Sequence, residues 1–86
     1  MKKFFVYILE CGDRNRTYYT GQTSRLSERI LEHMAGNGGA YTRGRLPVRL
    51  CHAEQYDSRG DAMRRERQIK RMTRKQKEEL INSGST

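Results

Sequence analysis

The chain has 86 residues, of which 18 are Lys or Arg and 10 are Asp or Glu, giving a formal net charge of +8 at neutral pH. This length predicts one domain, over residues 1–82, followed by a short flexible tail over 83–86. No apolar run is long enough to cross a bilayer, so we expect a cytoplasmic protein that does not enter the membrane. The positive charge favours nucleic acid as the partner.

Two strands are expected near the start of the chain. Residues 4–9 are six consecutive apolar or aromatic residues, which predicts a strand buried on both faces at the centre of a sheet. Residues 17–23 are aromatic and β-branched, and turn-forming residues lie between the two runs. This pattern predicts an antiparallel hairpin, which would bring Tyr7 of the first strand near Tyr19 of the second.

A first helix is expected to begin after Thr23 or Ser24, either of which can cap it, and to end at Gly36. Its apolar stripe consists of Leu26, Ile30, Leu31 and Met34. An adjacent face carries Arg25, Arg29 and His33, which recur every four residues. We expect that basic face to be able to meet a phosphate.

The middle of the chain is predicted to be a connector, a loop and a third strand. Glycine-rich residues 36–39 indicate a flexible connector. Residues 40–45 are expected to form a surface loop whose aromatic and basic side chains can grip a nucleic-acid strand, namely Tyr41, Arg43 and Arg45. The imperfect alternation of residues 48–56 predicts the third strand.

Two further helices complete the predicted order. Ser58 and Asp61 form a capping pattern that opens a long basic helix, and Thr73 with Gln76 predicts a break and a short final helix to Gly84. Eight Lys or Arg lie between residues 64 and 77. The expected phosphate contacts among them are Lys70, Arg71, Arg74 and Lys75.

Glu66 lies on the long helix among small and apolar neighbours, at the spacing of one helical face. A carboxylate there needs a hydrogen bond, an ion pair or a metal ion, because burying it bare is costly. Two interpretations stay open: Glu66 binds a metal, or it forms a structural ion pair with Arg29.

The residues resemble the GIY-YIG nuclease superfamily. Its two tyrosine-bearing triplets correspond to residues 5–7 and 19–21, and its helical arginine to Arg29, eight residues after Gly21. Its later glutamate corresponds to Glu66. The chain departs from the name-giving triplets at Phe5, Val6 and Thr20, and is most similar to the small single-domain bacterial members.

The resemblance implies an α+β fold, with a small three-stranded antiparallel sheet flanked by helices in the order β-β-α-β-α-α. It also implies an endonuclease that hydrolyses phosphodiester bonds with one Mg²⁺ or Mn²⁺ ion held by Glu66. The implied catalytic residues are Tyr7, Tyr19, Arg29, His33 and Glu66. Arg25 would assist the nucleic-acid contacts of the later loop and helices.

Arginine suits phosphate because its donor fork is bidentate and stays charged. Either tyrosine, or His33, could serve as general base. DNA is the expected substrate, with weak or structure-directed specificity, and a partner protein could supply more. The alternatives are a nucleic-acid-binding module without turnover and a small basic RNA-associated protein.

Overall fold

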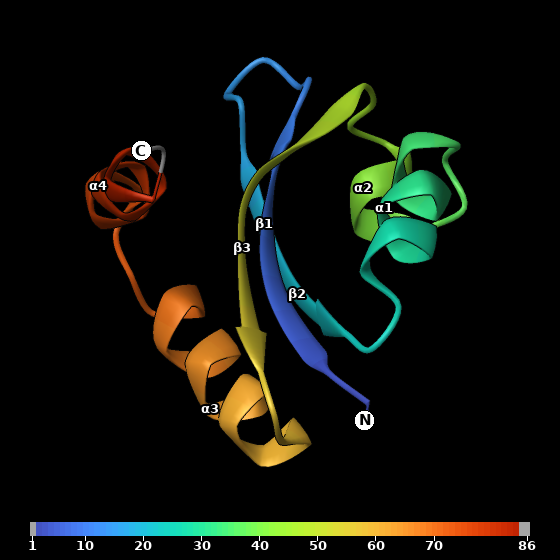
Figure 1. Cartoon of the computed structure of the whole chain (residues 1–86). Helices are drawn as coiled ribbons and strands as arrows, with labels where there is room; N and C mark the ends of the chain where they lie inside the picture. The colour runs from blue at the N-terminus through green and yellow to red at the C-terminus, as the bar shows by residue number, and fades with distance from the viewer. Residues whose placement is uncertain (1, 85–86) are drawn as a thin grey trace.

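The computed structural model describes residues 2–84 and folds them around one small sheet (Figure 1). In chain order the elements are β1 (Phe4–Cys11), β2 (Tyr18–Thr23), α1 (Leu26–Met34), α2 (Ala40–Arg43), β3 (Val48–Tyr56), α3 (Arg59–Lys70) and α4 (Arg74–Ser83). The expected α+β class and the order β-β-α-β-α-α are confirmed, with the short helix α2 added. No helix within residues 2–84 is long and apolar enough to span a membrane.

The sheet has the strand order β2-β1-β3, and both pairings are antiparallel. β1 is therefore the central strand, as its continuous apolar run predicts. Residues 6–9 of β1 are fully buried because helices cover both faces of the sheet (Figure 1). β2 and β3 form the two edges.

The helices form two layers with the sheet between them (Figure 1). On one face, α1 packs Ile30 and Leu26 against Tyr7 and Leu9 of β1. The other face, covered by α3 and α4, is built from a second apolar cluster whose buried members are Val6, Ile8, Ala62 and Ile69. Alternate residues of β1 therefore belong to different layers, which is the period of two expected of a strand.

The predicted caps of α3 and α4 are confirmed, whereas the cap expected for α1 at Thr23 or Ser24 is wrong, because Arg25 precedes the first turn and no side chain caps it. The hydroxyl of Ser58 accepts a hydrogen bond from the Asp61 amide at the start of α3, and Thr73 and Gln76 form a reciprocal capping box on α4. α1 ends in the left-handed region at Gly36, whose φ is +85°. The amides of Gly36 and Asn37 turn back onto α1 carbonyls, the usual pattern of a glycine helix stop.

Three expectations for residues 26–45 are wrong. His33 is 0% exposed and lies on the buried face of α1, whereas Leu31 and Met34, expected in the apolar stripe, are 64% and 48% exposed. Gly38, expected in a flexible connector, is buried. Residues 40–43 form the helical turn α2 instead of a loop. Within residues 33–42, His33, Gly38 and Thr42 are therefore the buried positions.

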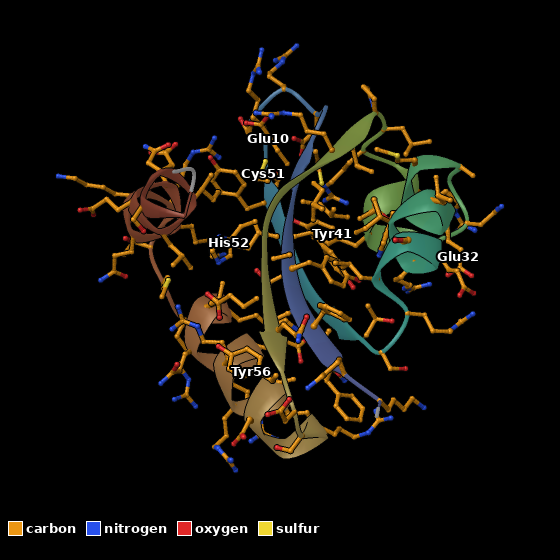
Figure 2. All side chains as sticks on the ribbon, viewed as in Figure 1. Glu10, Glu32, Tyr41, Cys51, His52 and Tyr56 are labelled. Carbon is orange, nitrogen blue, oxygen red and sulfur yellow. The ribbon has the colours of Figure 1, made fainter. Side chains whose placement is uncertain are left out.

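A polar cluster joins β3 to α3 on the face away from α1. The Glu54 carboxylate accepts hydrogen bonds from Arg65 Nε at 2.8 Å and from the Tyr56 hydroxyl at 2.5 Å, and lies 2.8 Å from His52 Nε2. Figure 2 shows His52 and Tyr56 on the side of β3 that faces the α3 and α4 layer. Although burial opposes it, these hydrogen bonds, Arg65 first, lower the pKa of Glu54 to about 2.

The last predicted segment was a tail over residues 83–86. Ser83 is the last residue of α4 and Gly84 follows as its cap. Residues 85 and 86 lie outside the described part of the chain.

Candidate active site

Tyr7 and Tyr19 lie on the same face of the sheet, as the hairpin predicts. Tyr7 pairs with Gly21 and Tyr19 pairs with Leu9, so the two tyrosines are diagonal neighbours whose ring centroids are 6.5 Å apart. A Cβ atom at Gly21 would lie 2.5 Å from the Tyr7 hydroxyl oxygen. Glycine is required at that position because the phenol crosses directly over the β2 backbone.

A buried hydrogen-bonded chain starts at the Tyr7 hydroxyl. It lies 3.0 Å from His33 Nε2, and His33 Nδ1 lies 2.8 Å from the Thr42 hydroxyl. Tyr7, His33 and Thr42 are each 1% exposed or less. Both ring nitrogens of His33 are thus satisfied within the protein, so the imidazole has a fixed orientation.

Gly38 allows this chain to form. A Cβ atom there would lie 2.2 Å from His33 Nδ1, so only glycine lets the backbone pass over the imidazole. Its carbonyl oxygen also accepts a 2.7 Å hydrogen bond from Arg29 Nη2. Thr42 and Gly38 were not among the predicted site residues, because their roles depend on a chain reversal after α1 that no local pattern indicates.

Arg29 is half-buried beside Tyr7. Its Nη1 donates to Glu32 at 3.0 Å and its Nη2 to Gly38. A guanidinium has five N–H donors, so these two bonds do not use them all, although the Tyr7 hydroxyl is a further partner nearby. The side chain of Arg29 is 32% exposed, which leaves it within reach of solvent and of a bound anion. In Figure 2, Glu32 extends on the outer side of α1, away from the sheet.

The protonation states follow from burial. Burial, with a further contribution from the neighbouring Tyr19, raises the pKa of Tyr7 to about 12 even though Arg29 opposes the rise. Burial, followed by the positive charge of Arg29, lowers the pKa of His33. At neutral pH the pair is therefore a protonated phenol beside a neutral imidazole. This is the arrangement in which a phenol can donate to an imidazole nitrogen.

Glu66 comes from the other layer. It lies on α3 between Ala62 and Ile69, which are buried against the sheet, and its own side chain is 19% exposed. Its carboxylate forms an ion pair with Lys70 at 3.2 Å, while Arg29 bonds to other partners. The structural pair between Arg29 and Glu66 that the sequence left open is therefore not formed. The charge of Glu66 is still close enough to Tyr7 to contribute to its raised pKa.

The donor chemistry of Glu66 and of two β2 side chains on the sheet face that α3 covers fits a hard divalent cation. Within residues 2–84 no three His, Cys, Asp or Glu side chains gather as a metal cluster. However, two buried oxygens on β2, Thr20 Oγ1 and Gln22 Oε1, have no hydrogen-bond partner. Mg²⁺ and Mn²⁺ take oxygen ligands and often use only one or two carboxylates, with neutral oxygens and water completing the shell.

Part of the predicted nucleic-acid surface lies on α1 and α2. The Tyr41 ring, 39% exposed, lies 5.4 Å from the Tyr19 ring, and the Arg45 guanidinium lies 4.0 Å from the Tyr41 centroid. Figure 2 shows Tyr41 directed from α2 toward the sheet. Arg25 and Arg43 are exposed, and Arg25 pairs with Glu28. These side chains border the site on one side.

The remaining predicted contacts lie on α3 and α4, across the sheet. Lys70, Arg71 and Lys75 are exposed. Arg74 instead holds the β1–β2 loop: its Nη1 donates to the carbonyls of Asn15 and Arg16, and its guanidinium lies 4.8 Å from the Tyr18 centroid. The sheet therefore separates these basic residues from Tyr41 and Arg45.

The chain matches a model of the GIY-YIG catalytic domain over residues 3–79. It belongs to the GIY-YIG family, a family of nucleases, and this confirms the resemblance seen in the residues.

Its relatives are small proteins of similar length. A UPF0213 protein of Halobacterium salinarum is 55% identical over 76 residues, which cover 88% of this chain and 96% of the relative. A UPF0213 protein of Syntrophus aciditrophicus is 49% identical over 98% of this chain and 95% of its own. The solution NMR structure of a UPF0213 protein from Bacillus halodurans is 40% identical, covers 96% of this chain and 87% of its own, and has a TM-score of 0.61.

Proposed function

We propose that this protein is a metal-dependent endonuclease that hydrolyses phosphodiester bonds in nucleic acid, with DNA as its substrate. The observation that carries the proposal is the buried chain from the Tyr7 hydroxyl through His33 to Thr42, placed beside the half-exposed Arg29. A phenol linked to a neutral imidazole can pass on a proton, and an adjacent guanidinium can hold a phosphate.

Arg29 is assigned the scissile phosphate. Its bonds to Glu32 and Gly38 fix the guanidinium plane and leave further N–H donors for phosphate oxygens. A planar fork held in this way matches phosphate geometry bidentately and keeps its charge at any working pH. Its neighbour Tyr19 is assigned to positioning the attacking water.

Tyr7 and His33 are assigned the proton transfer. As water attacks phosphorus, the Tyr7 oxygen takes a proton from that water while its own proton moves to His33 Nε2. The phenol therefore never has to ionise, which its pKa of about 12 would make costly. The transfer requires Nε2 to be unprotonated beforehand. In that tautomer the proton lies on Nδ1, and the Thr42 oxygen 2.8 Å away is placed to accept a hydrogen bond from it.

Glu66 would hold the divalent cation through its carboxylate. When bound, Mg²⁺ or Mn²⁺ supplies positive charge that stabilises the phosphate and the leaving oxygen. Lys70 does not prevent this, because its ammonium is 55% exposed and its surface pairing with Glu66 is weak.

The basic surface is assigned substrate affinity and not sequence recognition. Lysine and arginine contacts to phosphate are independent of sequence and weaken with salt. Weak or structure-directed selectivity, or a partner protein that directs cleavage, is therefore expected.

The test is incubation with labelled single-stranded, duplex, flapped and branched DNA, and with RNA, in Mg²⁺, Mn²⁺ or EDTA. Arg29→Ala should abolish cleavage and leave the fold intact. Arg64→Ala is the matched control, since Arg64 also pairs with a carboxylate three residues away, that of Asp61, and is assigned no contact with substrate. Equal cleavage by both variants, or no cleavage of any substrate by the wild type, would refute the proposal. Binding without any cleavage would favour the module without turnover.

A further inference from the structure

Two oxygen atoms on β2 are buried without partners. Thr20 is 3% exposed, and neither its hydroxyl oxygen nor the side-chain carbonyl oxygen of Gln22 has a hydrogen bond. Unsatisfied buried groups are rare in native proteins and call for a bound water, an ion or a functional role. Two such atoms two residues apart on one strand lie on the same face of the sheet.

That face is the one that α3 covers. Thr20 pairs with Ile8 and Gln22 pairs with Val6. Directly paired residues on antiparallel strands project to the same side, so Thr20 and Gln22 share the face of Val6 and Ile8. This face packs against Ala62 and Ile69 of α3.

Glu66 belongs to the same contact. It follows Ala62 by four residues and precedes Ile69 by three, so all three lie on one side of α3. Both neighbours are 0% exposed, which fixes that side of the helix against the sheet. The carboxylate of Glu66 on α3 and the two unpaired oxygens on β2 therefore lie in the same layer, between the helix and the sheet face that it covers.

We propose that Gln22 and Thr20 form, together with Glu66, an oxygen-lined site for a divalent cation between β2 and α3. This deepens the proposed function and rests on it. An amide oxygen and a hydroxyl are neutral ligands of the kind that Mg²⁺ and Mn²⁺ accept beside a carboxylate. They provide additional oxygen ligands, which are needed because no three Asp, Glu, His or Cys side chains gather as a metal site within residues 2–84. The cation also accounts for two polar atoms that folding alone leaves unpaired.

The direct test uses Mn²⁺ as a paramagnetic probe of the ¹⁵N-labelled protein in solution. Substoichiometric Mn²⁺ should broaden the side-chain NH₂ signals of Gln22 and the backbone amide of Glu66 first. The matched internal control is the side chain of Gln55, an exposed amide on the opposite edge strand β3. Three results would each overturn the proposal. The Gln22 and Gln55 signals could broaden in parallel, Glu66 could broaden without Gln22, or no signal could broaden selectively.

Gln22→Met supplies the second readout, because methionine keeps the length of the side chain and removes the amide. Without metal, its melting temperature should equal or exceed that of the wild type, since an unsatisfied buried group is deleted. Its Mn²⁺ affinity, from the same titration, should fall about tenfold, the scale on which groups around a metal act. Gln55→Met should change neither quantity.

The outcomes separate this inference from the proposed function. If Gln22→Met binds Mn²⁺ as tightly as the wild type does, the proposed cation site is overturned. Mn²⁺-dependent cleavage by the wild type would still support the proposed nuclease function. A melting temperature well below that of Gln55→Met shows a structural hydrogen bond at Gln22 and also overturns the cation site. Absence of metal-dependent cleavage in the wild type refutes the nuclease itself.

Discussion

Replacing Thr42 with valine tests whether His33 is held by a buried hydrogen bond. Valine keeps the shape of the side chain and deletes the hydroxyl that lies 2.8 Å from His33 Nδ1. Because Thr42 is 1% exposed and His33 0%, solvent does not replace the lost partner. Leaving a buried group unsatisfied costs about 2 kcal/mol. In a domain of this size, that loss lowers the melting temperature by roughly 8 to 16 °C.

The same substitution should reduce cleavage more than it reduces folding. Without the Thr42 oxygen, Nδ1–H is no longer favoured, so Nε2 is less available to take the Tyr7 proton. Measured where both proteins are folded, cleavage should fall about 100-fold, a typical contribution of general acid–base catalysis. Thr42→Ser, which keeps the hydroxyl, is the control for both measurements. A Thr42→Val variant that melts and cleaves like Thr42→Ser would refute the buried chain as the centre of the site.

Three further predictions concern pH, stability and salt. Because folding lowers the pKa of His33, the unfolded chain binds a proton at this residue more readily, so the stability of the fold should decline as the pH falls below 6.5. Denaturant titrations of His33→Gln should show a flatter decline than those of the wild type. The pKa of Glu54 is lowered from 4.5 to about 2, which corresponds to about 3 kcal/mol of folding stability, or about 2 kcal/mol after solvent screening. Glu54→Gln should therefore lose that much stability at pH 7 and approach the stability of the wild type near pH 2. Arg71→Gln with Lys75→Gln should reduce the salt slope of DNA binding by about two, measured by fluorescence anisotropy, and an unchanged slope would confine binding to the α1 and α2 side.

Most of the fold could be predicted because its signals are local. The apolar run of β1 requires cover on both faces, and the hairpin and the caps at Ser58 and Thr73 each depend on residues a few positions apart. The faces of α1 could not be predicted in the same way. After Leu26 and Ile30, the buried side continues either through Met34 or through His33, at spacings of four or three residues. In the structure, His33 lies on the buried side of α1, where Tyr7 and Thr42 satisfy both of its ring nitrogens.

The candidate site was likewise predictable only where its signals are local or come from the family resemblance. Strand pairing indicates that Tyr7 and Tyr19 are close, and the family resemblance selects Arg29 and Glu66. Thr42 and Gly38 escape such reasoning because a threonine and a glycine in a polar stretch usually indicate a turn. Their roles appear only when residues 36–42 fold back over α1, where the constraint is long-range packing and not composition.

The proposed site is divided between the two layers that flank the sheet, and this division bears on the role of Gly21 and its two neighbours on β2. Tyr7, Arg29 and His33 belong to the α1 side of the sheet, and Glu66 belongs to the α3 side, so the backbone of a central strand would separate them. Only at an edge can groups from both faces approach one ligand, and β2 is an edge strand. There the chain has Gly21, where the Tyr7 hydroxyl crosses the strand, flanked by the unpaired oxygens of its two neighbours. Since Glu54 and Arg65 join the other edge to α3, we expect a phosphate that contacts both Arg29 and Glu66 to approach along β2.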